Sequence, residues 1–268
     1  MAMPDSRDGK TSQPSVLITG ASAGLGEALA RAYAAPGRVL LLIARNSGRL
    51  DAVAVACRAL GATVVTGVID VTDWQAMAAC VRNFDAAHGL DLAIVNAGVF
   101  TGHGPDRLME TPAEIRALIG INLLGLAATV DAVLPGMRAR HAGRIALIGS
   151  LAALQPQADA PAYSASKAGA MAYGEALREF LIPDTIDVSL VYPGHIKTAQ
   201  ADIQVGAMPG IVSADEAARL IKRGLDRGRT FIAFPKSLLW LIRLGRLAPW
   251  RLRAFGGQDF RFHVKKGI

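Results

Sequence analysis

The chain has 268 residues, of which 51% are hydrophobic and 19% are charged, and its net charge is +7. This size suits one large domain with its own core. Cys57 and Cys80 lack metal-ligand spacing and indicate no oxidising compartment. The polar residues 1–14 lack the apolar stretch of a signal peptide, and no uninterrupted apolar run approaches the roughly 20 residues of a membrane-spanning helix. We therefore expect a cytoplasmic protein with a mobile tail at residues 1–14.

Short apolar runs alternate along the chain with longer stretches rich in Ala, Leu and charged residues. The runs predict strands buried on both faces, and the longer stretches predict helices. This alternation predicts a single α/β domain over residues 15–235, with a Rossmann-like, doubly wound parallel sheet of about seven strands and helices on both faces. In chain order we expect strand 15–19, helix 24–35, strand 38–44, helix 48–60, strand 62–69, helix 73–88, strand 92–98, helix 112–140, strand 144–150, helix 161–182, strand 187–192, helix 213–227 and strand 230–234.

A glycine-rich turn follows the first strand in the stretch TGASAGLGEALA. Gly20, Gly24 and Gly26 stand where the strand gives way to a helix. Glycine permits a tight turn and the close approach of a pyrophosphate, which the N-terminus of the helix then stabilises. The spacing is TGxxxGxG and differs from the common GxGxxG fingerprint. Alone, the turn fits either a phosphate cradle or a purely structural role.

The stretch PAYSASKAGA places Tyr163 and Lys167 four positions apart. On a helix such residues lie one turn apart on the same face. An ammonium near a phenol favours the phenolate and lowers its pKa, which is ordinarily about 10. A carbonyl that is reduced by hydride needs a proton on its oxygen. The tyrosine could supply that proton, while a nicotinamide cofactor supplies the hydride.

These motifs, in this order, resemble those of the short-chain dehydrogenase/reductase family. The resemblance runs from about Ser15 to Phe234, which is most of the chain. It implies an oxidoreductase that uses NAD(P) and interconverts a carbonyl and an alcohol. The pieces that carry it are TGASAGLG, DVTD at 70–73, NAG at 96–98, IN at 121–122, GS at 149–150, YSASK at 163–167, and YPG at 192–194 with Thr198.

The resemblance also implies roles for individual residues. Ser150 would hold the substrate oxygen against Tyr163, and Lys167 would also bind the nicotinamide ribose. Asn122 would hold a water in a relay to the lysine, and His195 would line the pocket or face solvent. No metal ligands are expected. The implied cofactor-binding residues are Gly20, Ser22, Gly24, Leu25, Gly26, Arg45, Asp70, Val71, Asn96, Ala97, Gly98, Tyr163, Lys167, Pro193, Gly194, Ile196 and Thr198.

The end of the second strand, LLLIARN, bears on the choice of cofactor. Ala44 stands where relatives that use NAD carry an aspartate, and Arg45 follows it. Because no carboxylate stands at this position, a 2′-phosphate would not be repelled. The Arg45 guanidinium could instead pair with it bidentately. We therefore predict a preference for NADP(H), with NAD as the alternative. One departure is Ala23, where many relatives that use NADP carry a second basic residue.

The segments expected to choose the substrate are 99–105, 151–162 and 199–213, which are largely apolar and uncharged. They favour a moderately apolar ketone, aldehyde or alcohol, and they offer a small acidic substrate no fixed cation except Lys197. Relatives in the family assemble through their long helices, so we expect a homodimer or homotetramer.

Residues 222–268 hold 12 Lys and Arg but 2 Asp and Glu, a net of +10. Within the extension 236–268, basic residues share one arc of a helical projection that Pro249 should interrupt, and apolar residues with Trp240 and Trp250 cover much of the rest. Packing against the domain or a subunit partner, and peripheral contact with the inner face of an anionic membrane, both remain open. No nucleic-acid partner is expected. Two alternatives to an enzyme also stay open, a dinucleotide-binding regulator and a membrane- or partner-binding module. The basic residues of the arc are Lys236, Arg243, Arg246, Arg251 and Arg253.

Overall fold

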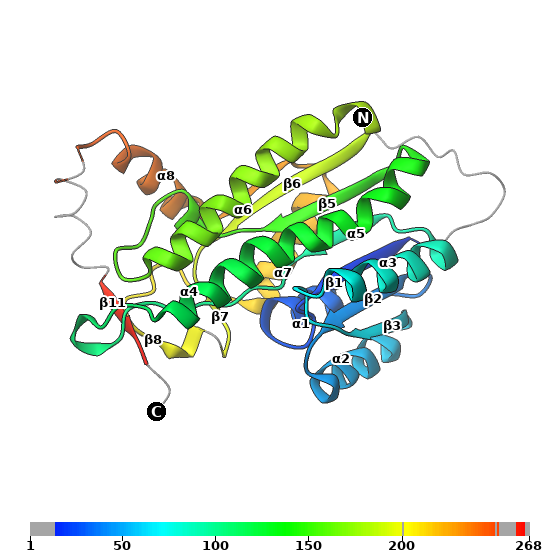
Figure 1. Cartoon of the computed structure of the whole chain (residues 1–268), viewed down its shortest axis with the longest axis horizontal. Coiled ribbons are helices and arrows are strands. Elements are labelled where there is room, and N and C mark those ends of the chain that lie inside the picture. The colour runs from blue at the N-terminus through cyan, green and yellow to red at the C-terminus, as the bar shows by residue number, and fades with distance from the viewer. Residues whose placement is uncertain (1–13, 200, 250, 252–260, 266–268) are drawn as a thin grey trace.

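The computed structural model of the chain describes residues 14–199, 201–249, 251 and 261–265 (Figure 1). Its centre is a seven-stranded parallel sheet with the order β10-β6-β5-β4-β1-β2-β3, which confirms the predicted fold. Of the tail predicted at residues 1–14, Pro14 alone falls within the described residues. The strands of the sheet are β1 (Ser15–Thr19), β2 (Val39–Ala44), β3 (Thr63–Val68), β4 (Leu92–Val95), β5 (Gly143–Ile148), β6 (Ile186–Pro193) and β10 (Phe231–Phe234).

Helices cover both faces of the sheet (Figure 1). Successive strand residues point to opposite faces, so each strand feeds two separate cores. Leu17 and Leu41 belong to the core under α3, α5 and α6. Ile18 and Leu42 belong to the core under α1, α2 and α7. The helices are α1 (Gly24–Tyr33), α2 (Ser47–Ala59), α3 (Trp74–His88), α4 (Pro112–Ile119), α5 (Gly125–Arg140), α6 (Pro161–Phe180), α7 (Ala214–Asp226) and α8 (Lys236–Gly245).

The strand order reverses next to β1. The chain runs outward from β1 through β2 to β3, then returns to β4 on the other side of β1. In an open parallel sheet, ligands bind beyond the carboxyl ends of the strands at such a switch point. The glycine-rich turn after β1 and the NAG turn after β4 meet at this position.

The predicted helix 112–140 contains a break in its regular winding. α4 and α5 are joined by a π-helical turn, Gly120–Leu124, so that three helical segments form one continuous rod. Within the described chain, Pro112–Arg140 is one helix whose length and composition would suit a membrane span. Half of its most apolar window is buried in the structure, and buried core helices of globular domains pass the same test.

Two small sheets lie beyond the main one. β11 (Phe262–Val264) pairs antiparallel with β8 (Gln204–Gly206), and β7 (Ile196–Lys197) pairs parallel with β9 (Val212–Ser213). Residues 261–265 of the C-terminal extension therefore pack against the domain. The Trp250 and Arg253 side chains of the predicted amphipathic segment lie outside the described residues. Short 3-10 helices occupy Pro105–Arg107, Leu151–Ala153, Ile182–Asp184 and Ala201–Ile203.

Candidate active site

A cavity of about 1500 Å³ opens at the carboxyl edge of the sheet. Every catalytic or cofactor residue expected from the sequence lines it, with the single exception of Asn122. Residues from the turn after β1 to the C-terminal strand β11 thus meet around one space. The cavity divides into a glycine-rich cradle, an end beside Arg45 where the family resemblance would place the adenosine (the adenosine end), a centre around Tyr163, and an apolar end near α8.

The glycine-rich turn forms a cradle that larger side chains would fill. Gly20 and Gly24 have φ angles of +67° and +56°, in the left-handed region that favours glycine. A Cβ on Gly26 would lie 2.0 Å from the Gly20 carbonyl oxygen, so the turn and α1 approach as closely as backbone allows. Ala23 at the start of α1 gives no side-chain cap. Free N–H groups at this helix end suit a diphosphate, so the cradle fits a dinucleotide.

The turns after β1 and β4 are tied together by hydrogen bonds. The Thr19 hydroxyl accepts from the backbone N–H of Asn96 at 3.0 Å and from that of Ala97 at 3.1 Å. The Asn96 amide donates back to the Thr19 carbonyl at 3.0 Å. This network holds the NAG turn beside the glycine-rich turn. Thr198 closes the cradle from the opposite side, since its Cγ2 lies 3.1 Å from where a Cβ on Gly24 would be.

The adenosine end of the cavity carries two arginines. Arg45, directly after β2, lies 3.5 Å from the Asp70 carboxylate, and its side chain is 65% exposed. The N–H of Thr72 donates to Asp70, and this bond contributes most to holding the pKa of that carboxyl below its usual value. Arg49, in the first turn of α2, lines the same end. Arg49 was not predicted to belong to the site, although its spacing of four from Arg45 was a usable signal.

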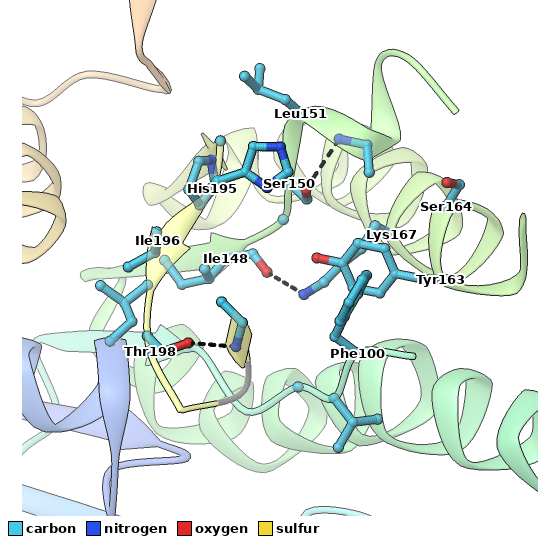
Figure 2. A pocket seen from close by; sticks show the side chains of 18 of the residues that line it. Phe100, Ile148, Ser150, Leu151, Tyr163, Ser164, Lys167, His195, Ile196 and Thr198 are labelled. Carbon is cyan, nitrogen blue, oxygen red and sulfur yellow. Dashed lines mark hydrogen bonds between the residues drawn. The ribbon is translucent and has the colours of Figure 1, made fainter. Parts of the chain in front are cut away.

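Tyr163 and Lys167 project from one face of α6 into the centre of the cavity, and Ser150 faces them from the end of β5 (Figure 2). The Ser150 hydroxyl lies close enough to the Tyr163 hydroxyl to influence its pKa. The Ser150 hydroxyl also accepts from the backbone N–H of Ala152 at 3.1 Å. The Lys167 amine donates to the Ile148 carbonyl at 3.0 Å. Three functional groups from two elements are thus held around one point.

The ionisation of this group differs from the simplest expectation. Burial raises the pKa of Tyr163, and the weaker effect of the nearby Ser150 hydroxyl lowers it. Burial also lowers the pKa of Lys167 to about 8. The expected lowering of the tyrosine pKa by the lysine is not found in this structure, because both groups are desolvated and the amine is directed at the Ile148 carbonyl. Below pH 8 the lysine still carries most of its charge.

Asn122 lies beneath the cavity wall, in the π-helical turn. Its amide group pairs with the backbone of Val99, donating to the carbonyl at 2.9 Å and accepting from the N–H at 2.8 Å. It also donates to the Ser166 hydroxyl at 3.0 Å. A Cβ on Gly98 would lie 3.1 Å from the Asn122 oxygen and 3.3 Å from the Lys167 amine. Asn122 therefore holds the loop after β4 next to the lysine.

An aromatic wall borders the space in front of Tyr163. The ring of Phe100 meets the Tyr163 ring edge-on with centroids 4.9 Å apart, and Phe262 of β11 lies 6.1 Å beyond Phe100. Phe262 was not predicted to line the pocket, because its segment lies about 100 residues from Tyr163 in the chain.

Asp159 fixes the C-terminal strand against this wall. It pairs with Arg261 at 2.7 Å and accepts from the backbone N–H of Phe262 at 3.1 Å. Arg261 lines the cavity, but this ion pair engages its charge. His195 also lines the cavity, and burial lowers its pKa. Lys197, the cation considered for an acidic substrate, is not among the lining residues of the described chain. Nor do the described residues contain a group of three His, Cys, Asp or Glu that could hold a metal ion.

Fold, cradle and polar centre together define a Rossmann-type oxidoreductase. The sequence profile of the short chain dehydrogenase family matches residues 14–206. An uncharacterized oxidoreductase of Myxococcus xanthus is 36% identical over 87% of this chain and 92% of its own length. The 3-dehydrosphinganine reductase TSC10B of Arabidopsis thaliana is 31% identical over 80% of this chain and 67% of its own.

Solved structures agree with these matches. A short-chain dehydrogenase from Sphingobium yanoikuyae in complex with NADPH superposes with a TM-score of 0.74 at 30% identity, covering 87% of this chain and 95% of that one. The chain belongs to the short-chain dehydrogenase/reductase family. It is therefore an oxidoreductase that acts on CH–OH or C=O groups with a nicotinamide dinucleotide.

Proposed function

We propose that the protein reduces a moderately apolar ketone or aldehyde with NADPH, or oxidises the corresponding alcohol with NADP, using Tyr163 as the acid–base group. The observation that carries this proposal is the meeting of Tyr163, Ser150 and Lys167 in a cavity continuous with the glycine cradle. The cofactor supplies or accepts the hydride. All the residues that the family resemblance implies to bind the cofactor line this cavity.

The protein's own part in the reaction is to hold the substrate oxygen and to move one proton. In the reducing direction the Ser150 hydroxyl donates a hydrogen bond to that oxygen, and the Tyr163 hydroxyl gives it a proton. The remaining phenolate is stabilised by the Lys167 ammonium, which predominates below pH 8. Asn122 positions the loop beside the lysine. The oxidising direction reverses each step.

NADP(H) is the proposed cofactor, with NAD as the weaker one. Arg45 and Arg49 line the adenosine end, and a pair of guanidinium groups suits a 2′-phosphate. Asp70 lies 3.5 Å from Arg45, so a phosphate there would compete with this carboxylate for the arginine. The NADPH bound to the Sphingobium relative supports the same choice.

An apolar substrate is proposed because Phe100, Phe262 and the α8 side chains Leu238 and Ile242 line the far end of the cavity. The Arabidopsis relative is a reductase of 3-dehydrosphinganine, and a lipid-like carbonyl would suit this lining. The same proposal includes a cytoplasmic homodimer or homotetramer, a catalytic domain over residues 15–235 and a basic C-terminal extension over 236–268.

The test is NADPH oxidation over a panel of ketones and aldehydes by wild type and by Tyr163→Phe. Loss of the acid–base group should lower kcat about 10²–10⁴-fold, with NADPH binding retained in a thermal-shift assay. Tyr173→Phe, on the same helix but outside the cavity lining, is the matched control and should keep wild-type turnover. Wild-type turnover by Tyr163→Phe would refute the mechanism. NADPH binding without turnover of any carbonyl would favour a dinucleotide-binding regulator.

A further inference from the structure

Four large apolar side chains stand exposed on the outer side of α8 and its C-terminal turn. Their exposed fractions run from 55% for Leu241 to 84% for Leu247. The last three follow the first by one, four and seven positions, and on a helix this spacing places all four in one arc. The opposite side of α8 packs on the core through Leu239. We call Trp240, Leu241, Leu244 and Leu247 the apolar strip.

A contiguous strip of this kind differs from the single exposed apolar residues that any surface carries, and it marks an interaction site. The charged residues beside the strip indicate what kind of partner it contacts. Lys236, Arg243 and Arg246 accompany the strip, and the Arg243 guanidinium lies 5.7 Å from the centre of the Trp240 ring. No acidic residue occurs in the sequence from Arg227 to Arg251. Apolar side chains with a purely cationic border complement an anionic lipid surface.

A second copy of the chain fits this surface less well. In a two-fold dimer the same face would meet itself, so each cationic border would face an identical one. α8 contains no acidic residue that could pair with Lys236 or Arg243 and so relieve that repulsion.

The strip also adjoins the cavity. Leu241 belongs to the strip and lines the cavity that contains Tyr163. Leu238, Ile242, Gly245 and Ala248 line the cavity from the same segment. An apolar molecule that leaves a lipid surface beside Leu241 would therefore enter the cavity along apolar side chains.

We propose that the apolar strip docks the protein on an anionic lipid surface, and that a lipid-borne carbonyl or alcohol enters the cavity there. The entry route rests on the proposed function, whereas the docking does not. Two kinds of contact contribute, insertion of aliphatic and indole side chains and attraction between cations and lipid phosphates.

Co-sedimentation of the full-length protein with vesicles tests the docking. Wild type should bind vesicles of phosphatidylcholine with phosphatidylglycerol, bind pure phosphatidylcholine weakly, and be released by salt. Leu244→Gln/Leu247→Gln should lower binding about tenfold or more, since two exposed aliphatic side chains are lost. The matched control is Val55→Gln/Ile182→Gln, which replaces aliphatic side chains 63% and 72% exposed elsewhere. It should bind as wild type does.

A charge variant and an activity assay complete the test. Lys236→Gln should weaken binding to the anionic vesicles about fivefold, because a cation near such a surface contributes about 1 kcal/mol. Neither Leu244 nor Leu247 lines the cavity, so turnover of water-soluble ketones should equal that of wild type in the double variant. The docking would be overturned if the wild-type protein stayed in the supernatant or if the double variant bound vesicles as wild type does. It would also be overturned if the protein formed a dimer that the double variant dissociates. Vesicle binding without any carbonyl turnover would overturn the proposed function and leave the docking intact.

Discussion

The amine of Lys167 is buried, and it donates a hydrogen bond to the neutral carbonyl of Ile148. Burial therefore disfavours its charged form and lowers its pKa from 10.5 to about 8. Below pH 8 both the folded and the unfolded chain carry the ammonium, so the cost of burying it is fully present. Between about pH 8 and pH 10.5 Lys167 is protonated in the unfolded chain but largely neutral in the folded one. The free energy of unfolding therefore rises with pH over this range.

Replacing Lys167 by Met should therefore stabilise the cofactor-free protein near neutral pH. We expect a gain of about 1–3 kcal/mol at pH 7, reduced by the lost hydrogen bond to Ile148 and shrinking as the pH rises through 8 toward 10.5. Urea unfolding at pH 7 and pH 10 measures the difference. Lys197→Met, on an exposed lysine, is the control and should show no such dependence on pH. A variant less stable than wild type at pH 7 would contradict this account.

At the scale of elements, the strands of the main sheet were predictable because each is a near-continuous apolar run buried on both faces. The seven predicted strands all exist, with ends shifted by at most a few residues. The π-helical turn around Asn122 was not predictable, since the apolar pattern of residues 112–140 is compatible with an unbroken α-helix. β8 and β11 were also missed, because a three-residue strand is too short to show a period of two.

The same reasoning separates the predictable from the unpredictable part of the site. Gly26, Ser150 and Tyr163 belong to motifs with characteristic neighbours, so their positions could be inferred. Phe262 has no such motif, and it is brought to the aromatic wall by the pairing of β11 with β8 and by the contacts of Asp159. Arg49 follows a strand end at helical spacing, and this weak signal was overlooked.

β11 should influence which substrates fit. Phe262→Leu shortens the aromatic wall beside Phe100, so we expect kcat/KM to rise for bulky ketones relative to small ones. Val264→Ala is the matched control, because Val264 is buried on the same strand but does not line the cavity. Kinetics over a size series of ketones measure the ratio. An equal change of the ratio in both variants would mean that the strand acts through stability alone.

At the scale of the whole molecule, cofactor binding should stabilise the fold, because the cavity draws residues from both sides of the switch point. A ligand at a hundredfold its Kd adds about 2.7 kcal/mol to the free energy of unfolding. We expect NADPH to raise Tm more than NADH at equal concentration. Arg45→Gln should reduce the NADPH shift and leave the NADH shift unchanged.

Differential scanning fluorimetry with both cofactors provides the measurement. Arg219→Gln, on α7 and outside the cavity lining, serves as the control for loss of a surface arginine. A larger shift with NADH than with NADPH in wild type would overturn the proposed cofactor preference, whatever the variants do.

The pairing of β11 with β8 has a consequence for biosynthesis. During translation, β1 to β6 with the glycine cradle emerge from the ribosome some seventy residues before Phe262 does. We therefore expect the nascent chain to fold around its nucleotide while Phe262, the outer part of the aromatic wall, is still missing. Selectivity toward the carbonyl compound is therefore acquired after the cradle has formed, when β11 leaves the exit tunnel and pairs with residues 204–206.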